Sequence, residues 1–289
     1  MQTKYKQIRF LFFTLLLIIS QTTLAKINIV AAENFYGDIA QTLGGDYVTV
    51  TSILNNPQQD PHLFSTSPSV AKNVAHADIV IYNGKHYEDW MPRLLSVPGK
   101  KKHREIIVVA DLTNTQANDN PHIWYDPNTM WLYAQKLTAI LIALDPDHKA
   151  DYLLQLSALE KKQQAFMAYL TKIKPRLKGQ PVAATEPVFN YMADALGLSM
   201  QAKAFQWSVE NDGTPSPSAM REMLAAIQQR KIRALIYNQQ VSDPMMTNLI
   251  ETAKQHDVPV IAVTETQPKG MDYYTWMRTQ LEALVAANS

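Results

Sequence analysis

The sequence predicts an α/β protein of two lobes, each with a four-stranded, mostly parallel sheet flanked by helices, joined by a long, rigid α-helix. Short apolar runs alternate with helical patterns in both halves of the chain, which is typical of βαβ units and parallel sheets. Each half supplies four such runs. The stretch between the halves carries helical periodicity and no strand signal.

Residues 1–25 have the pattern of a secretory signal peptide. They carry three basic side chains and no acid, then an apolar run over residues 10–19, then small residues that end in Ala25. The apolar run is about half of the ~20 residues that a membrane span needs. We therefore expect cleavage of this signal and a periplasmic location, with an uncleaved anchor helix as the alternative. Because there is no cysteine near the cleavage site, no lipid anchor is expected.

The N-terminal α/β lobe is predicted over residues 26–145. Its strands are expected at Ile27–Ala31, Tyr47–Leu54, Asp78–Tyr82 and Glu105–Ala110. Its helices are expected at Phe35–Leu43, Pro68–His76 and His86–Leu95, and a further helical stretch opens at Asp126-Pro127. Pro68 fits the first position of a helix, and Ser67 fits the cap that precedes it.

Residues 146–178 are predicted to form the connecting helix. Between Asp147 and Lys174 the chain has no Gly or Pro, and its apolar residues recur at helical spacing. About 25 helical residues extend ~37 Å at 1.5 Å per residue. That length fits a rigid connector along both lobes better than a helix inside one of them. The alternative is two ordinary helices with a loop near Lys161.

The C-terminal α/β lobe is predicted over residues 179–289, with the same alternation of strands and helices. Its strands are expected at Pro181–Thr185, Met200–Gln206, Arg233–Asn238 and Val258–Thr264. Its helices are expected at Pro187–Leu196, Pro217–Arg230, Pro244–Gln255 and Asp272–Ala286.

The composition narrows the chemistry. The chain contains no cysteine, which excludes disulfides, thiolate catalysis, iron–sulfur clusters and cysteine-held zinc. Any metal must therefore be held by His, Asp or Glu. Lys plus Arg is 27 and Asp plus Glu is 26, a balance that argues against a nucleic-acid binder. Loss of the signal segment removes three basic and no acidic side chains, which takes the formal net charge from +1 to −2.

Four metal-capable side chains follow predicted strands at their carboxyl ends, where open α/β sheets bind ligands. They are His62, His122, Glu186 and Glu265, two from each lobe. Two imidazoles and two carboxylates can hold a divalent metal. Zinc accepts these ligands at ~2.0–2.2 Å and is usually four-coordinate, whereas bidentate carboxylates raise the coordination number and suit manganese.

His62 and His122 stand in matching loops of the form Asx-Pro-His-apolar-aromatic. Proline restricts its own φ and the residue before it, so each imidazole has a stiff backbone approach. Considered alone, a histidine in a loop is more often a surface residue than a metal ligand. Glu186 also fits the role of an acidic side chain in the first turn of a helix, where it interacts favourably with the helix dipole. We expect the other five histidines to be solvated, with His86 the least certain of them. Glu33 is the main alternative to the two predicted carboxylate ligands.

At these motifs the chain resembles the metal-binding substrate-binding proteins of zinc and manganese ABC importers, a family with a long helical backbone between its lobes. The resemblance covers essentially all of the mature chain. It rests on Asp60-Pro61-His62, Asn120-Pro121-His122-Ile123-Trp124 with Asp126-Pro127, Thr185-Glu186, Gly213-Thr214-Pro215-Ser216-Pro217 and Tyr273-Tyr274 with Met277. It implies a periplasmic receptor that captures one divalent ion between its lobes and delivers it to a membrane permease driven by a cytoplasmic ATPase.

The resemblance carries three metal ligands directly onto His62, His122 and Glu186. Many members have Asp as the fourth ligand, where this sequence offers Glu265, which is one methylene longer. Asp111–Asn120 is short, so no auxiliary metal-scavenging loop is expected. Members with Glu as the third ligand include manganese and iron binders, but two closely held imidazoles slightly favour zinc over manganese.

Two other classes compete with this prediction. A secreted metal-dependent hydrolase would use the same His/Glu site with a bound water, and it would need an open coordination position and a general base. No H-E-x-x-H signature is present. A two-lobe receptor for a sugar or amino acid leaves the paired Asx-Pro-His loops unexplained. We therefore predict a metal receptor that is not an enzyme and that acts as a monomer.

Overall fold

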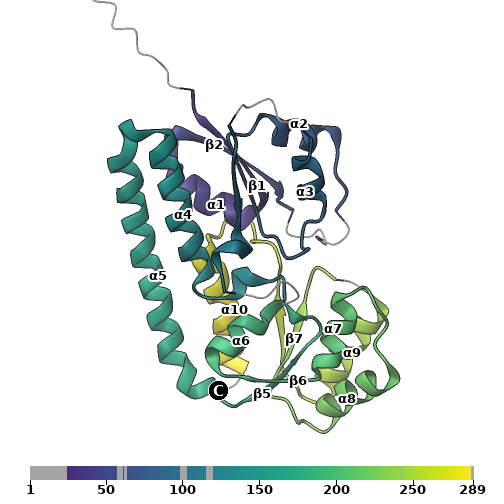
Figure 1. Cartoon of the computed structure of the whole chain (residues 1–289). Helices are drawn as coiled ribbons and strands as arrows, with labels where there is room; N and C mark the ends of the chain where they lie inside the picture. Colours follow the sequence, from purple (N-terminus) through teal and green to yellow (C-terminus); the bar gives the residue numbers. More distant parts are fainter. Residues whose placement is uncertain are drawn as a thin grey trace, which may run out of the picture.

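The structure, a computed structural model, describes residues 25–56, 61, 64–97, 103–114, 120–241 and 243–287. Two α/β lobes lie one above the other, and a long helix runs along one side of both (Figure 1). No helix within the described ranges is both long and apolar enough to span a membrane. Residues 1–24 of the predicted signal segment and the predicted ligand His62 lie outside the described residues.

The N-terminal lobe contains a four-stranded, all-parallel sheet in the order β2-β1-β3-β4. Its strands are β1 (Ile27–Glu33), β2 (Val48–Leu54), β3 (Ile79–Tyr82) and β4 (Glu105–Val108). Its helices are α1 (Asn34–Gly44), α2 (Pro68–His76) and α3 (Trp90–Leu95), with 3-10 turns η1 (Gly45–Tyr47), η3 (Val109–Leu112) and η4 (Ile123–Tyr125). In the register of the sheet, Val30 pairs with Thr51 on one side and with Val80 on the other.

Residues 29–32 of strand β1 are buried on both faces of the sheet, which explains why this part of the strand is uninterruptedly apolar. Successive side chains of a strand point to opposite faces. Ile29 and Ala31 join the main apolar core with Phe35 of α1. Val30 and Ala32 join a second apolar cluster under α2 and α3. This two-sided burial leaves the carboxyl end of the sheet as the place where polar side chains gather.

The C-terminal lobe repeats this architecture, with a second all-parallel sheet in the order β6-β5-β7-β8. Its strands are β5 (Pro181–Ala184), β6 (Ser199–Gln201), β7 (Leu235–Asn238) and β8 (Val260–Val263). Its helices are α6 (Asn190–Leu196), α7 (Lys203–Glu210), α8 (Pro217–Gln228), α9 (Pro244–Gln255) and α10 (Tyr273–Ala287), with the 3-10 turn η6 (Pro187–Phe189). The two four-stranded parallel sheets confirm the predicted fold class.

A continuous helix, α5 (Lys149–Leu177), links the lobes, and it passes through Lys161 without a break, as predicted. Its 29 residues extend about 44 Å at 1.5 Å per residue. Helix α4 (Thr129–Leu144) lies beside it, and the 3-10 turn η5 (Pro146–His148) joins the two.

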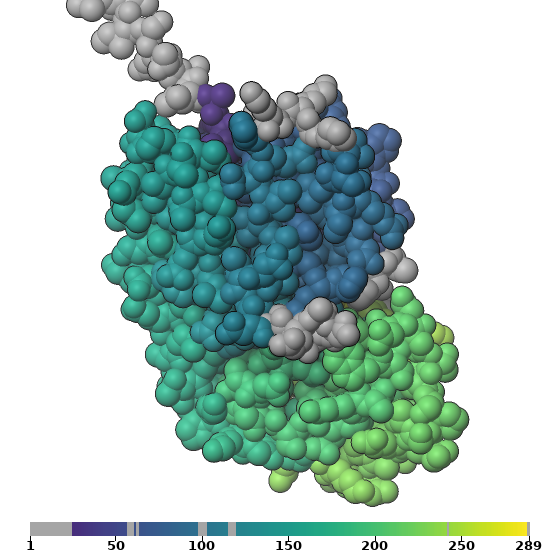
Figure 2. Space-filling view, viewed as in Figure 1, coloured from purple at the N-terminus to yellow at the C-terminus, as the bar shows by residue number. Residues whose placement is uncertain are grey.

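One apolar core runs through both lobes and along α5. At the start of the helix, the Tyr47 hydroxyl of the N-terminal lobe donates to Asp151, and at its end Leu177 is fully buried. Helix α10 reaches back from the C-terminal lobe, and its Trp276 lies 5.8 Å from Phe35 of α1 between ring centroids. The space-filling view shows the surface of α5 continuing from the upper lobe to the lower one (Figure 2). The connection is therefore packed rather than loosely hinged.

The predicted strand Met200–Gln206 is wrong beyond Gln201. Ala202 has a φ of 52°, a left-handed conformation that ends the strand. The residues that follow form α7, which buries Phe205 and Gln206 on one side. This correction matters because the end of α7 reaches the site described below.

The loop after β3 also departs from the prediction. Gly84, Lys85 and His86 have φ values of 85°, 56° and 63°, which no right-handed helix permits. The predicted helix His86–Leu95 therefore begins only at Trp90. Similarly, β4 ends before the predicted limit and continues as η3.

The predicted helix caps are present. The Ser67 hydroxyl accepts a hydrogen bond from the backbone N–H of Val70, with Pro68 in the first turn of α2. Such a cap satisfies one of the backbone donors that a helix start leaves unpaired.

Candidate metal centre

His122 lies in the loop after β4, and Asn120 fixes its imidazole. The Asn120 side-chain amide donates to the Pro187 carbonyl at 2.5 Å, so its Oδ1 faces His122 as an acceptor. That oxygen accepts the backbone N–H of His122 at 3.0 Å and lies 2.6 Å from Nδ1. Nδ1 therefore carries the proton, and Nε2 offers its lone pair to the site. The His122 side chain is fully buried, and its Nε2 has no hydrogen-bond partner among the described residues.

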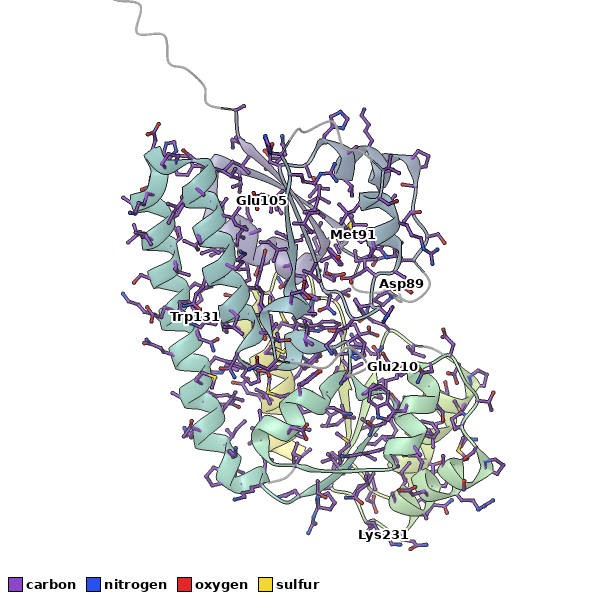
Figure 3. The ribbon with its side chains drawn as sticks, in the orientation of Figure 1. Asp89, Met91, Glu105, Trp131, Glu210 and Lys231 are labelled. Atoms are coloured by element: carbon purple, nitrogen blue, oxygen red, sulfur yellow. The ribbon has the colours of Figure 1, made fainter. Side chains whose placement is uncertain are left out.

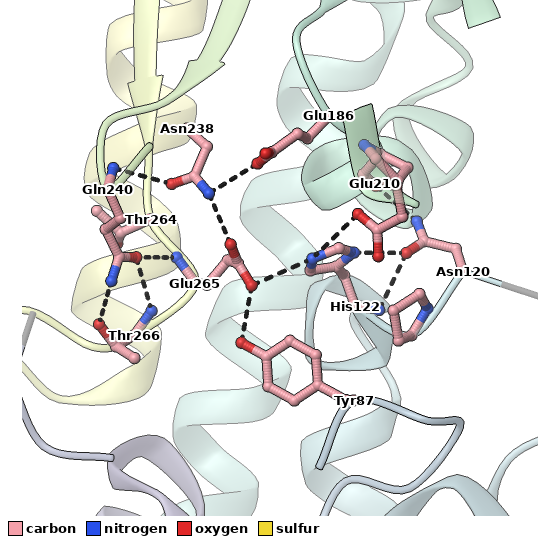
Figure 4. Close-up of polar contacts among 12 residues, drawn as sticks. Tyr87, Asn120, His122, Glu186, Glu210, Asn238, Gln240, Thr264, Glu265 and Thr266 are labelled. Atoms are coloured by element: carbon pink, nitrogen blue, oxygen red, sulfur yellow. Dashed lines mark hydrogen bonds and ion pairs between the residues drawn. The ribbon is translucent and has the colours of Figure 1, made fainter. Parts of the chain in front are cut away.

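Two carboxylates of the C-terminal lobe belong to the same region, and Glu265 lies close to that nitrogen. Glu186 follows β5, and Glu265 follows β8, each at the carboxyl end of its strand. Both residues are more than nine-tenths buried. Oε2 of Glu265 lies 3.3 Å from His122 Nε2 (Figure 4). The carboxyl ends of the two sheets therefore meet at one place, as expected for ligand sites in open α/β sheets.

Asn238, the last residue of β7, holds both carboxylates. Its Nδ2 donates to Glu186 Oε2 at 2.7 Å and to Glu265 Oε1 at 2.6 Å. The backbone N–H of Gln240 donates to Asn238 Oδ1 at 3.1 Å, and this bond fixes the orientation of the amide. The Gln240 side chain in turn accepts the backbone N–H of Glu265 at 2.6 Å. Glu265 is thus held through Oε1, while its Oε2 points to His122.

Tyr87 closes the site from the N-terminal lobe. Its hydroxyl donates to Glu265 Oε2 at 2.7 Å. Burial, reinforced by the charges of Glu265 and Glu33, raises the pKa of Tyr87 well above its usual range, so the hydroxyl stays a donor. Its ring centroid lies 5.9 Å from that of His122 and 4.9 Å from that of Trp124. These aromatic contacts exclude water from one side of the imidazole.

A third carboxylate reaches the same nitrogen. Glu210, at the end of α7, places Oε2 4.0 Å from His122 Nε2, and its side chain is only 7% exposed. Figure 3 shows Glu210 where the two lobes face each other.

The site holds an excess of buried negative charge. The pKa of Glu186 is raised to about 7, because burial and then the charge of Glu265 raise it, while the hydrogen bond from Asn238 opposes the rise. Burial lowers the pKa of His122, but Glu210 and Glu265 outweigh it, so the net pKa is raised. Both shifts favour the protonated forms, which lowers the buried negative charge, and a divalent cation would compensate that charge in place of the protons.

The structure brings three of the four predicted ligands, His122, Glu186 and Glu265, to one region, and the fourth, His62, lies outside the described residues. Within those ranges, no group of three or more His, Asp or Glu side chains is arranged to hold a metal ion. The complete ligand set therefore stays a prediction, and binding requires adjustment of the carboxylates around His122.

The residues considered as alternative metal ligands lie outside this site. Glu33 is fully buried inside the N-terminal lobe, where burial and the charge of Glu88 raise its pKa well above the usual range. None of the other five histidines is buried, as predicted. The least certain of them, His86, is exposed, and its Nδ1 lies 3.0 Å from Asp89.

Three residues of this site were not predicted from the sequence: Tyr87, Glu210 and Asn238. Asn238 ends a predicted strand, so its position at the carboxyl edge was foreseeable, but a neutral amide carries no signal of metal chemistry. Glu210 was hidden because a strand was predicted in place of the helix that carries it.

Two α/β lobes joined by one long helix, with buried carboxylates facing a histidine of the other lobe, form a two-lobe architecture with an acidic site between the lobes. The model of one protein family, described as the periplasmic component A of a zinc-uptake complex, ZnuA, matches residues 29–287. The chain belongs to this family.

Relatives in sequence are named as substrate-binding lipoproteins of ABC transporters. The manganese ABC transporter substrate-binding lipoprotein ScaA of Streptococcus gordonii is 25% identical over 288 residues, which cover 90% of this chain and 88% of the relative. PsaA of Streptococcus pneumoniae, also named a manganese ABC transporter substrate-binding lipoprotein, is 25% identical over 289 residues, 92% of this chain and 90% of the relative. These relatives are named lipoproteins, whereas this sequence contains no cysteine.

Solved structures share the fold. The periplasmic zinc-binding protein TroA from Treponema pallidum superposes with a TM-score of 0.77 at 18% identity, covering 92% of this chain and all of that one. A cadmium-bound periplasmic metal-binding protein from Candidatus Liberibacter asiaticus gives a TM-score of 0.75 at 23% identity, covering 91% of this chain and all of that one.

Membership of this family confirms the predicted class. The chain is a metal-uptake receptor of the ABC-importer type that acts outside the cytoplasm, and it is not an enzyme. The secreted hydrolase and the sugar or amino-acid receptor are therefore set aside.

Proposed function

We propose that the chain captures one divalent transition-metal ion, zinc or manganese, between its lobes, with His62, His122, Glu186 and Glu265 as ligands. The observation that carries this proposal is the approach of buried carboxylates to the unpaired Nε2 of His122, with Glu265 at 3.3 Å. Burial of several carboxylates is costly unless a cation compensates them.

The choice between the two metals follows from the donor atoms. Two imidazole ligands slightly favour zinc, and the matching family model is named for a zinc-uptake complex. Carboxylates that bind through both oxygens favour manganese, and the Streptococcus relatives are named for manganese. We propose zinc as the slightly preferred ion.

We also infer that the chain, as a monomer, delivers the ion to the permease of an ABC importer. This inference rests on family membership and on the names of the relatives as substrate-binding proteins of ABC transporters. The packed connection along α5 supports a receptor whose lobes move little during capture and delivery.

Metal uptake by chelator-stripped mature protein tests the proposal. We expect one ion per chain by elemental analysis and a rise in melting temperature, equivalent to ~2.7 kcal/mol when free metal is about 100 times Kd. Competition between zinc and manganese then determines the preference. Absence of both uptake and stabilisation with either metal contradicts the proposal.

A further inference from the structure

Glu210 is an unusual residue for the end of a helix. A carboxylate at a helix C-terminus faces the negative end of the helix dipole, which is unfavourable. The Glu210 side chain is nevertheless 93% buried, since its exposed fraction is 7%. Its Oε2 has no hydrogen-bond partner among the described residues. Burial of an unpaired carboxylate oxygen costs free energy, so the helix itself does not explain this placement.

The two other carboxylates of the site differ from Glu210 in their partners. Asn238 donates to both Glu186 and Glu265. The unpartnered Oε2 of Glu210 is instead directed to His122, whose Nε2 also lacks a hydrogen-bond partner within the described ranges. In Figure 4 the contacts from Glu210 and from Glu265 meet at this one nitrogen. Two unpaired polar atoms of opposite lobes therefore face the same small region.

Each of the two distances at His122 Nε2 allows a shared ion, although the described side chains do not form a ready-made metal site. Two donors that each lie about 2.1 Å from one metal ion are at most about 4.2 Å apart. His122 Nε2 lies 3.3 Å from Glu265 Oε2 and 4.0 Å from Glu210 Oε2, and both distances are within this limit.

We propose that Glu210 is an additional ligand of the captured ion and that it shifts the selectivity of the site toward manganese. This inference rests on the proposed function. Four protein ligands complete the usual coordination of zinc. A further oxygen donor raises the coordination number and the carboxylate share of the site, which benefits manganese more than zinc.

Substitution of Glu210→Gln tests this role, because it keeps the size of the side chain and removes its charge. The matched control is Glu222→Gln, a glutamate exposed on α8 of the same lobe. Dissociation constants for Mn²⁺ and Zn²⁺ are measured for both variants and for the unsubstituted protein by chelator competition. We expect Glu210→Gln to weaken manganese binding at least about tenfold and zinc binding clearly less, while the control changes neither.

Two results overturn the proposal: affinities equal to those of the control, or an equal loss for both metals, which a purely electrostatic effect would produce. If the unsubstituted protein binds neither metal, the proposed function itself fails, so the two failures are distinguishable.

Cobalt substitution gives a second readout that does not depend on affinity. Visible d–d absorption of Co²⁺ weakens as its coordination number rises. We expect Glu210→Gln and Glu210→Ala to intensify the spectrum of the cobalt-loaded protein, with circular dichroism used to confirm that each variant is folded. A spectrum unchanged in both folded variants contradicts ligation by Glu210.

Discussion

The two lobes have the same sheet topology, but the acid that closes the first strand is used differently in each. Glu33 ends β1 in the N-terminal lobe, and Glu186 follows the equivalent β5 in the C-terminal lobe. Glu33 is fully buried, and burial followed by the charge and side-chain hydrogen bond of Glu88 raises its pKa well above the usual range. Glu186 instead accepts a hydrogen bond from Asn238 and faces the other lobe.

The asparagines at the next equivalent position show the same contrast. Asn83 follows β3, and its side-chain amide donates to the carbonyls of Gly84 and Pro121. Asn238 ends β7, and its amide donates to two carboxylates. One lobe uses its amide to shape the loop before His122, and the other uses it to orient acidic side chains.

One architecture thus supplies two kinds of ligand. The N-terminal lobe neutralises its own acid internally and presents an imidazole. The C-terminal lobe leaves its acids facing the boundary, where compensation must come from a proton or a cation. The sequences at the strand ends, rather than the fold, determine which lobe carries the charge.

Removal of the C-terminal acids should give the largest effect. We expect Glu186→Gln with Glu265→Gln to weaken metal binding more than about 100-fold, since loss of partners outside the ligand shell alone costs 10–100-fold. Glu33→Gln should leave the affinity unchanged, although Glu33 occupies the equivalent position. Calorimetric titration measures both, and a similar loss in Glu33→Gln would break the distinction between the lobes.

Asn238→Ala should have the next largest effect. The carboxylates lose the donor that orients them, and such changes typically lower metal affinity about 10–100-fold. Elemental analysis after dialysis against graded free metal reports the change. Affinity equal to that of the unsubstituted protein would mean that Asn238 does not position the ligands.

Metal affinity should rise with pH between about 6 and 8, because a ligand must lose its proton before it binds metal. The pKa of Glu186 is about 7, so Glu186 releases its proton on binding in this range, and the raised pKa of His122 acts in the same direction. Each proton released adds up to about tenfold in affinity per pH unit. Titrations in buffers of different ionisation enthalpy count the protons, and a pH-independent affinity would contradict the assignment.

Glu33 should affect stability rather than binding. Its pKa is raised in the folded protein, so the folded state binds more protons than the unfolded state. Stability therefore falls as pH rises from the unfolded pKa to the folded one, by at most about 1.4 kcal/mol per pH unit. We expect Glu33→Gln to flatten this fall in the metal-free protein, as measured by urea unfolding at several pH values. A steeper pH dependence in the variant would reverse the sign and contradict the burial of a protonated Glu33.

The smallest effect should be the change of overall shape on metal binding. Helix α5 and the apolar core join both lobes, so small-angle scattering should detect little compaction. A large decrease in the radius of gyration would show that the lobes close like a hinge.

The sequence predicts the fold well because buried strands and long helices leave periodic apolar patterns. The same patterns placed Glu186 and Glu265 at strand ends, where the carboxyl edges of the two sheets meet. Local conformation was harder to predict. The left-handed Ala202 separates β6 from α7, and nothing in the composition of the segment signals it.

The partners of the predicted ligands were not foreseeable for a different reason. The contacts of Tyr87 with Glu265 and of Glu210 with His122 join residues far apart in the chain. Such contacts depend on how the lobes are oriented, which local sequence patterns do not encode. The position of His62 stays a prediction from its Asx-Pro-His loop.

The most direct test of metal capture between the lobes is calorimetric titration of zinc into the metal-free mature protein and into the variant with His62→Ala and His122→Ala. We expect one ion per chain for the unsubstituted protein and no measurable binding for the variant, with the fold of the variant verified by circular dichroism. Equal affinity in both proteins would show that the imidazoles do not hold the ion, and it would contradict the proposed site.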